Sequence, residues 1–513
     1  MRFRAKKKPV KASGSSAASA LSTPQITQLG FTSAEVAHFI HGEYSAPDSA
    51  LSIPSISPHT GQTLAHIAAG NSDDIDRAVQ SARRTFEAGT WRDLAPQERK
   101  RRLFQWADLI NEHRDSLGTL ETLEMGKPIS FTTTNDVDGV LNAIRWYAEA
   151  LDKIYGEVGP SGEDALVTIT REPLGVIGAI IPWNYPMVLA ALKFAPAIAL
   201  GNSIVVKPSE LCSLSILRLA SLAVEAGIPP GVLNVVSGVG SEAGAALARH
   251  MDVDKIVFTG SGPVGRSIQV LAGESNGKSV QIEAGGKSPH IVFDDAGSLE
   301  TVAERVAFSL CYNSGQTCSA GTRLLVSRSR QDELIEQLRL ALANWHPEDP
   351  LRPESRMGPL VSETQLERVS GYIERGREAG SELVIGGSQV LQSTGGFYIE
   401  PTVFSNVENH TELAQEEIFG PVLSVIPFDG FEEGIRLAND TRYGLAASVW
   451  TENLSRGIRA SRAVRAGMVW VNTYQRSDIT FPFGGFKASG HGRDRSLHAF
   501  DEYSSLKSTW IHL

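Results

Sequence analysis

The chain has 513 residues and a net charge of −10, with 42% hydrophobic residues, 21% charged residues, 48 glycines and 25 prolines. At ~150 residues per domain this length suggests two to four domains, and the composition excludes a largely disordered chain. The negative charge argues against nucleic acid as a main partner.

The cysteine count and the hydropathy pattern indicate the redox compartment of the protein and whether it spans a membrane. The three cysteines are too few for a disulfide framework and lack the spacing of metal ligands, so we expect a reducing, cytoplasmic location and no metal. The longest apolar stretch, residues 187–201, is interrupted by Lys193 and Pro196 and falls short of the ~18 residues of a membrane span. We therefore expect no membrane partner.

The first 34 residues differ from the rest of the chain. They contain basic and serine residues but no acidic residue. This composition also occurs in organelle transit peptides. Because lysine outnumbers arginine and no amphipathic period is visible, a disordered basic tail over residues 1–34 is the preferred prediction.

The next 120 residues are predicted to form structural elements only. Residues 54–70 form two short strands around a turn at Thr60-Gly61, and a helix begins with Ser72 as its capping residue. Further helices follow Pro96 and cover residues 120–125 and 137–151. We assign no chemistry to these elements.

Residues 155–172 predict a β-hairpin. An isolated two-stranded ribbon is only marginally stable in water, so this hairpin needs another partner, for example a second subunit. The final run, residues 506–513, has no local partner and could complete the ribbon.

A regular alternation of strands and helices begins after Pro173. Strands start at Val176, Ser203, Leu233, Lys255 and Val280, and helical segments separate them. This pattern predicts a doubly wound parallel sheet. Ligands of such sheets bind beyond the carboxyl ends of the strands.

Polar and glycine-rich segments follow four of these strands. They are Pro182-Trp183-Asn184, Lys207-Pro-Ser-Glu210, Gly260-Ser261-Gly-Pro-Val-Gly265 and Glu283-Ala-Gly-Gly. The third matches the G-x-G-x-x-G dinucleotide pattern, which is a weak signal by itself. Either Glu283, ~20 residues further on, or the Lys207 and Glu210 pair could bind the ribose of a nucleotide.

A second α/β alternation starts at Ser288 and contains Cys318. Gly315, Gln316, Thr317 and Ser319 surround this cysteine, whereas Cys311 ends an apolar run. A polar turn suits a thiolate that meets a substrate. On local sequence alone, a small residue filling a tight turn is an equally good interpretation, because free cysteines are mostly buried.

These stretches together resemble the aldehyde dehydrogenase superfamily from about Phe39 to the C-terminus. The resemblance rests on the four segments above and on Gly315-Gln-Thr-Cys318, Glu417-Ile-Phe419-Gly-Pro and Pro482-Phe483-Gly-Gly, in the family's order and spacing. Residues 145–150, 283–288 and 489–498 look most like the bacterial gamma-glutamyl-gamma-aminobutyraldehyde dehydrogenase branch.

The resemblance implies an α/β fold with two doubly wound parallel-sheet domains and a small β oligomerisation arm. Residues 35–153 and 174–285 would form an NAD-binding Rossmann-like domain, and residues 286–485 a catalytic domain. Residues 154–173 and 486–513 would form the arm of a homodimer or homotetramer.

The resemblance also implies residue roles. Cys318 would be the nucleophile, Asn184 the oxyanion donor and Glu283 the general base. NAD, with NADP as a weaker alternative, would contact Pro182, Trp183, Lys207, Glu210, Gly260, Ser261, Gly265, Glu417 and Phe419.

The substrate would be a small-molecule aldehyde in a tunnel near Cys318. Tyr185, Arg476, Asp478 and Phe483 border it by resemblance, and the two charges favour an aminoaldehyde of polyamine catabolism. Because exposed ion pairs are common, Arg476 and Asp478 could instead pair only with each other. A broad-range aldehyde dehydrogenase, a CoA-acylating enzyme and an inactive relative remain alternatives.

Overall fold

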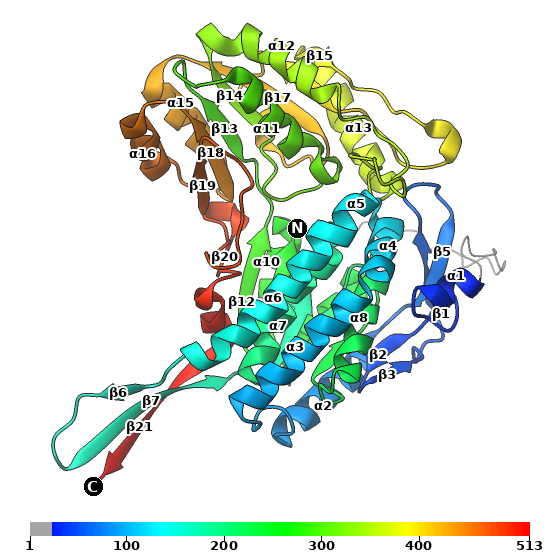
Figure 1. The fold of residues 1–513 in the computed structure, drawn as a ribbon, viewed down its shortest axis with the longest axis vertical. Helices are drawn as coiled ribbons and strands as arrows, with labels where there is room; N and C mark the ends of the chain where they lie inside the picture. Colours follow the sequence, from blue (N-terminus) through cyan, green and yellow to red (C-terminus); the bar gives the residue numbers. More distant parts are fainter. Residues whose placement is uncertain (1–22) are drawn as a thin grey trace.

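The computed structural model describes residues 23–513, which form two α/β lobes and a protruding ribbon (Figure 1). Helix α1 (Thr23–Gln28) opens this part of the chain. Ile26, Leu29 and Phe31 are buried in the core of the first lobe. The predicted disordered tail is therefore wrong for residues 23–34, because these apolar side chains pack; residues 1–22 lie outside the described part.

The first sheet matches the first predicted alternation. Its strands are β2 (His38–Ile40), β3 (Glu43–Ser45), β8 (Val176–Ile180), β9 (Ser203–Lys207), β10 (Leu233–Val235), β11 (Lys255–Gly260), β12 (Ser279–Ala284) and β20 (Gly490–His491). They lie in the order β20-β12-β11-β8-β9-β10-β2-β3. The inner strands β8 to β12 pair in parallel, and the outer strands add antiparallel edges.

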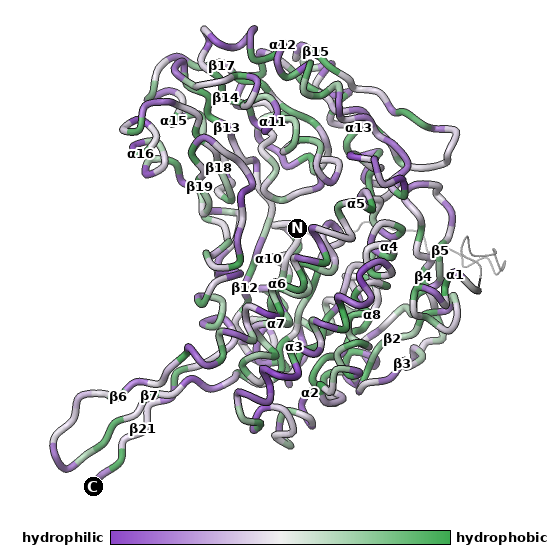
Figure 2. Tube along the Cα trace, viewed as in Figure 1, coloured by the Kyte–Doolittle hydropathy of each residue, from purple (hydrophilic) through white to green (hydrophobic). Residues whose placement is uncertain are grey.

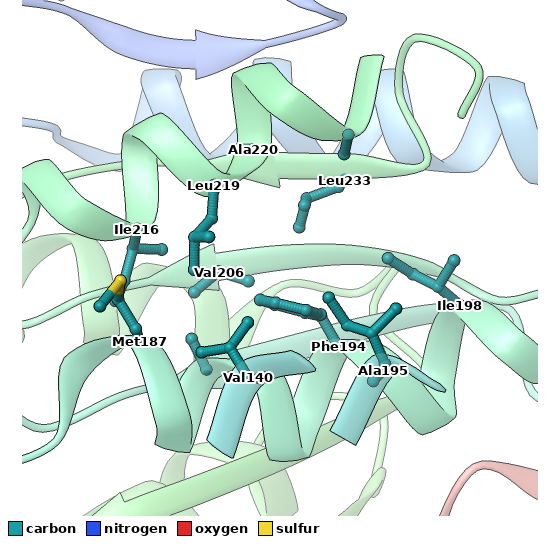
Figure 3. Packing of buried hydrophobic residues seen from close by; sticks show 14 of the residues in the cluster. Val140, Met187, Phe194, Ala195, Ile198, Val206, Ile216, Leu219, Ala220 and Leu233 are labelled. Atoms are coloured by element: carbon teal, nitrogen blue, oxygen red, sulfur yellow. The ribbon is translucent and has the colours of Figure 1, made fainter. Parts of the chain in front are cut away.

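The helices of the first lobe cover this sheet or pack on the helices that do. They are α2 (Ser72–Glu87), α3 (Pro96–Glu112), α4 (Arg114–Met125), α5 (Ile129–Phe131), α6 (Val137–Ala150), α7 (Pro186–Leu200), α8 (Leu214–Glu225), α9 (Ala245–Arg249) and α10 (Gly262–Gly273). Figure 3 shows Val140 of α6, Phe194 of α7 and Leu219 of α8 gathered near Val206 of β9. Because apolar burial is the main stabilising contribution, this packing fixes the sheet that carries the loops of the site.

The predicted start of α2 needs a small correction. The capping residue is Asn71, whose side chain accepts hydrogen bonds from the backbone N–H groups of Asp73 and Asp74. Ser72, the predicted cap, is the first residue inside the helix. Asn and Ser cap equally well, so the sequence could not choose between two adjacent candidates.

The second sheet lies in the other lobe. Its strands are β13 (Pro289–Val292), β14 (Arg323–Ser327), β15 (Glu382–Ile385), β16 (Thr402–Ser405), β17 (Val422–Phe428), β18 (Ala446–Trp450) and β19 (Met468–Val471). They lie in the order β15-β16-β17-β14-β13-β18-β19, parallel except for β15 against β16. Strands β15 to β17 extend the predicted set, and the predicted fold class is confirmed.

The helices of the second lobe are α11 (Leu299–Cys311), α12 (Gln331–Leu342), α13 (Glu363–Glu378), α14 (Glu412–Gln415), α15 (Gly430–Asn439) and α16 (Leu454–Ala463). Short 3₁₀ or π segments are η1 (Thr132–Asp136), η2 (Leu151–Lys153), η3 (Gly240–Gly244), η4 (Tyr312–Gly315), η5 (Arg328–Arg330), η6 (Gln392–Thr394), η7 (Lys487–Ser489) and η8 (Leu497–Glu502). A small sheet near the N-terminus joins β1 (Glu35–Val36), β4 (Ser52–Ile56) and β5 (Thr63–Ala68). Strands β4 and β5 are the pair predicted around Thr60-Gly61.

The ribbon, which we call the arm, consists of β6 (Glu157–Gly159), β7 (Ala165–Pro173) and β21 (Ser504–His512). Strand β21 pairs antiparallel with the whole of β7, which confirms the predicted partner of the hairpin. The arm extends away from both lobes, and hydrophobic stretches are visible along it (Figure 2). Between residues 23 and 513, no helix combines the length and apolar character needed to cross a bilayer.

Candidate active site

A cavity of about 960 Å³ is lined by residues of both lobes. Loops at the carboxyl ends of β8, β11 and β12 meet the segment after η4 there. The sequence-predicted residues that line the cavity are Pro182, Trp183, Asn184, Tyr185, Gly260, Ser261, Glu283, Cys318, Glu417, Phe419 and Phe483. Those that do not are Lys207, Glu210, Gly265, Arg476 and Asp478.

Cys318 follows a backbone segment of unusual conformation. Asn313 and Ser314 have φ values of 53° and 54°, a left-handed conformation that costs energy in residues other than glycine. The Asn313 amide stabilises the segment, because its Nδ2 donates to the backbone oxygens of Asn184 at 2.8 Å and Gln316 at 3.2 Å. The turn before Cys318 is thus attached to the loop that carries Asn184.

The three cysteines differ in accessibility. Cys212 and Cys311 are fully buried, and burial raises the pKa of each thiol well above its usual value. Cys318 is partly exposed and lines the cavity. Burial also raises the pKa of Cys318, to about 12, and the carboxylates of Glu417 and Glu283 add to the effect. Cys318 is therefore the thiol that a substrate in the cavity can reach.

Asn184 brings an amide to the same cavity. Its side chain is 3% exposed, and Nδ2 donates a hydrogen bond to the backbone oxygen of Gln316 at 3.0 Å. A side-chain amide has two N–H donors, so one hydrogen remains for an oxygen atom of a ligand.

Glu283 is the last but one residue of β12. It is 3% exposed, and neither carboxyl oxygen has a hydrogen-bond partner among residues 23–513. Burial raises the pKa of Glu283 well above its usual value, and the nearby charge of Asp494 adds to the shift. A raised carboxyl pKa near a substrate cavity is typical of a group that exchanges protons.

Sequence reasoning missed a buried ion pair beside Glu283. Lys193 Nζ on α7 lies 2.7 Å from both carboxylate oxygens of Asp494, and Gln281 Nε2 donates to Asp494 Oδ1 at 3.0 Å. Both charged side chains are almost completely buried. One signal was available, because a lysine inside the apolar run 187–201 requires a buried partner.

The other end of the cavity contains groups that fit a nucleotide. Ser261 is the N-cap of the twelve-residue helix α10 and makes no side-chain capping bond, so the free N–H groups of this helix end can bind phosphate. Glu417 Oε1 accepts a hydrogen bond from the backbone N–H of Gly286 at 3.1 Å. Burial raises the pKa of Glu417 to about 7. The Phe419 ring packs edge-on against Trp183, with 5.2 Å between ring centroids.

Three predicted cofactor residues lie outside the cavity lining. Lys207 is buried, and its Nζ donates to the Gly238 backbone oxygen at 3.0 Å and lies 3.6 Å from Glu210 Oε2. Gly265 packs α10 against the sheet, since a Cβ there would lie 3.2 Å from Ile282 side-chain atoms. That packing role is enough to explain the last glycine of the G-x-G-x-x-G pattern.

Of the predicted substrate residues, the aromatic Tyr185 and Phe483 line the cavity, and the charged Arg476 and Asp478 do not. Tyr185 bonds through its hydroxyl to Thr317 Oγ1 at 2.6 Å, next to Cys318. Arg476, Ser477 and Asp478 are all exposed, and of the three only Ser477 lines the cavity.

Comparisons with known proteins agree with this geometry. A family model described as the aldehyde dehydrogenase family matches residues 44–509. The NADP/NAD-dependent aldehyde dehydrogenase PuuC of Escherichia coli (strain K12) is 48% identical over 475 residues, covering 93% of this chain and 95% of that protein.

Two solved structures are also similar. The gamma-glutamyl-gamma-aminobutyraldehyde dehydrogenase from Burkholderia cenocepacia J2315 is 50% identical, with a TM-score of 0.92 over 96% of this chain and 99% of that chain. A mutant of the P. syringae AldA indole-3-acetaldehyde dehydrogenase, in complex with NAD⁺ and IAA, is 50% identical, with a TM-score of 0.93 over 95% and 99%. The chain therefore belongs to the aldehyde dehydrogenase family and is an NAD(P)-dependent aldehyde dehydrogenase.

Proposed function

We propose that the protein oxidises an aminoaldehyde of polyamine breakdown to the carboxylic acid, with Cys318 as nucleophile, Asn184 as oxyanion donor and Glu283 as general base. The observation that carries these roles is the convergence of a reachable thiol, a free amide donor and an unpaired carboxyl on one cavity. No other cysteine of the described chain lines that cavity.

The first step is addition of the Cys318 thiolate to the aldehyde carbon. The carbonyl oxygen becomes an oxyanion, which the Asn184 amide and the backbone N–H of Cys318 can stabilise. Loss of one such donor typically costs about 3 kcal/mol of transition-state stabilisation. Because Asn184 is buried and already oriented by Gln316, it needs little reorganisation when the charge develops.

NAD fits the opposite end of the cavity. Gly285 leaves room for Glu417, since a Cβ there would lie 1.9 Å from Glu417 Oε2. The N-terminus of α10 would hold the pyrophosphate, and Glu417 with Phe419 would hold the nicotinamide ribose. The chemistry that NAD supplies when bound is acceptance of the hydride from the adduct on Cys318.

Glu283 completes the reaction by removing a proton from the water that attacks the resulting thioester. Its unpaired oxygens are available to hydrogen-bond such a water. Water attack transfers the acyl group from sulfur to oxygen, and Cys318 leaves as a thiolate. A CoA-acylating enzyme would not need this base, so Glu283 supports hydrolysis.

Glu210 supports a preference for NAD over NADP. A carboxylate there can accept hydrogen bonds from the adenosine ribose but repels a 2′-phosphate. The neighbouring Lys207 ammonium, 3.6 Å away, weakens this repulsion, so NADP should be used poorly and not excluded. A kcat/KM for NADP equal to that for NAD would contradict this role of Glu210.

Support for an aminoaldehyde comes from the start of α6 and from the relatives. Asn135, Asp138 and Asn142 line the cavity together with the aromatic ring of Trp470, and Asp138 also pairs with Arg114 at 2.7 Å. Acidic side chains and aromatic rings both attract an ammonium group. PuuC and the Burkholderia enzyme match this chain along nearly all of their length, and the latter is named for an aldehyde of this class.

The test is kcat/KM for gamma-glutamyl-aminobutyraldehyde, 4-aminobutyraldehyde, 4-guanidinobutyraldehyde, hexanal, benzaldehyde and indole-3-acetaldehyde. We expect the nitrogen-bearing aliphatic aldehydes to be preferred, and Asp138→Asn to reduce that preference. Asp478→Asn is the matched control, because Asp478 is exposed and outside the cavity lining. If hexanal or an aromatic aldehyde is the best substrate, the enzyme is a broad-range aldehyde dehydrogenase.

A further inference from the structure

Lys127 is a buried charged residue behind the cavity that the proposed mechanism does not use. It follows Gly126, the left-handed C-cap of α4, and is 1% exposed. Its Nζ lies 2.6 Å from both carboxylate oxygens of Asp136, which ends η1 and lines the cavity. Lys127 itself does not line the cavity. A buried charge needs partners, and these partners indicate what the residue does.

The other partners of Lys127 are two aromatic rings. Its Nζ lies 4.3 Å from the centroid of the Tyr185 ring and 4.8 Å from that of the Tyr312 ring, both within the range of a cation–π interaction. Tyr185 is the N-cap residue of α7, and Tyr312 is the first residue of η4. Both line the cavity. One ammonium group therefore contacts three cavity-lining residues that belong to three separate elements.

These rings begin next to the proposed nucleophile. The Tyr185 hydroxyl bonds to Oγ1 of Thr317, the residue before Cys318, at 2.6 Å. The Tyr185 and Tyr312 rings stack with 6.4 Å between their centroids, and Tyr312 stacks on Phe308 at 5.0 Å. Phe308 lines the cavity too, so the three rings form what we call the aromatic row. An aldehyde with a chain of several carbons can lie along this row, whereas acetaldehyde is too short to do so.

The backbone that carries Lys127 is fixed on both sides. A Cβ at Gly126 would lie 2.6 Å from the side chain of Pro359, and the Ile129 N–H donates to the Pro350 oxygen at 2.8 Å. A buried ion pair often adds no more stability than apolar side chains of similar volume. Stability alone therefore does not explain the charge of Lys127, and its contacts with the aromatic row point to a role in the site.

We propose that Lys127 is a positioning residue that holds the aromatic row from behind and so orients long-chain aldehydes beside Cys318. Its ammonium group fixes the rings of Tyr185 and Tyr312, and the pair with Asp136 keeps the ammonium group in place. Lys127 transfers no proton and acts on the reaction only through these rings. This inference rests on the proposed nucleophile and adds a determinant of chain-length preference.

The test compares kcat/KM for hexanal with kcat/KM for acetaldehyde in the full-length enzyme with NAD. Lys127→Met/Asp136→Asn removes both charges at similar side-chain volume and leaves no unpaired buried charge. The KM for hexanal should rise about ten-fold, the loss typical of misplaced apolar contacts with a substrate chain. The kcat, the KM for NAD and the values for acetaldehyde should change little. Arg83→Met/Asp254→Asn is the matched control, because this 2.6 Å pair lies outside the cavity lining.

A second comparison separates an effect through the rings from a direct effect of Asp136. The same two substitutions are made in Tyr185→Leu, which lacks one of the rings that Lys127 holds. They should then change the ratio of hexanal to acetaldehyde much less, because residues that act through a shared contact are not additive. Additive effects would overturn the proposal.

An unchanged ratio of hexanal to acetaldehyde in Lys127→Met/Asp136→Asn would also overturn it. Equal losses for both aldehydes, together with a lower Tm, would assign the ion pair to stability only, and the proposal would be wrong. Lys127→Gln/Asp136→Asn gives the same comparison if the methionine variant does not fold. If Cys318→Ala still oxidises both aldehydes, the proposed function fails independently of Lys127.

Discussion

Cys318 is the residue on which the proposed chemistry depends, because Cys212 and Cys311 are enclosed in the core. Cys318→Ala should lower aldehyde oxidation by about a thousand-fold or more, since the covalent route is lost. NAD binding, measured by fluorescence or calorimetry, should survive because the thiol is not needed to hold the nucleotide. Cys212→Ala and Cys311→Ala are the matched controls and should stay active. Turnover of Cys318→Ala at more than a few per cent of wild type would exclude the nucleophile assignment.

Replacement of Glu283 should separate two steps of the proposed reaction. Glu283→Gln keeps the shape of the side chain and removes the base, so acyl transfer to water should slow by ~10²–10⁴-fold while the acyl-enzyme still forms. Rapid-mixing experiments should record a burst of about one NADH per site before slow turnover, and intact-mass spectrometry should detect the acylated protein. Absence of both the burst and the acyl-enzyme would place Glu283 in an earlier step.

At the scale of elements, the site depends on how closely the end of β12 approaches the segment after α14. Gly285→Ala would place a Cβ 1.9 Å from Glu417 Oε2 and displace this carboxylate. We expect a raised KM for NAD, measured in initial-rate assays, with a smaller effect on the KM for aldehyde. Gly273→Ala is the control, because a Cβ at this last residue of α10 would meet nothing within 4 Å. Equal KM values for NAD in both variants would contradict the proposed role of Glu417.

At the scale of the whole molecule, the arm predicts assembly. Trp510 is 68% exposed and Val158 74% exposed, on a ribbon that stands apart from both lobes (Figure 1). Exposed apolar groups of this size usually mark an interaction surface.

We predict a homodimer or homotetramer in which the arm is covered. Light scattering should give a smaller assembly for Trp510→Glu than for the wild type, and Thr509→Glu, at an exposed neighbour on the same strand, controls for the added charge. Identical masses for wild type and Trp510→Glu would remove the arm from the interface.

Much of the fold followed from the sequence because its signals are local. Strands β8 to β12 are short runs between turn residues, and their alternation with helices determines a parallel sheet whatever the rest of the chain does. The same alternation located Asn184, Glu283 and Cys318 at strand ends or in a polar turn. The four consecutive residues 182–185, which follow β8, all line the cavity.

Only the tertiary structure decided where side chains point and which residues distant in the sequence pair with each other. Arg476 and Asp478 were predicted beside the aldehyde, but the direction of a side chain depends on the local backbone, and Ser477 lines the cavity in their place. Lys193 and Asp494 are 301 residues apart, and no local pattern pairs a charge in an apolar helix with a carboxylate of the last segment. The sequence by itself determined the family and placed the three proposed catalytic residues, because these lie in local motifs. The surroundings of Cys318, including the carboxyl groups of Glu417 and Glu283 in the same cavity, were decided by the packing of the two lobes, because electrostatic interactions depend on separation in space and on burial, and neither is encoded in local order.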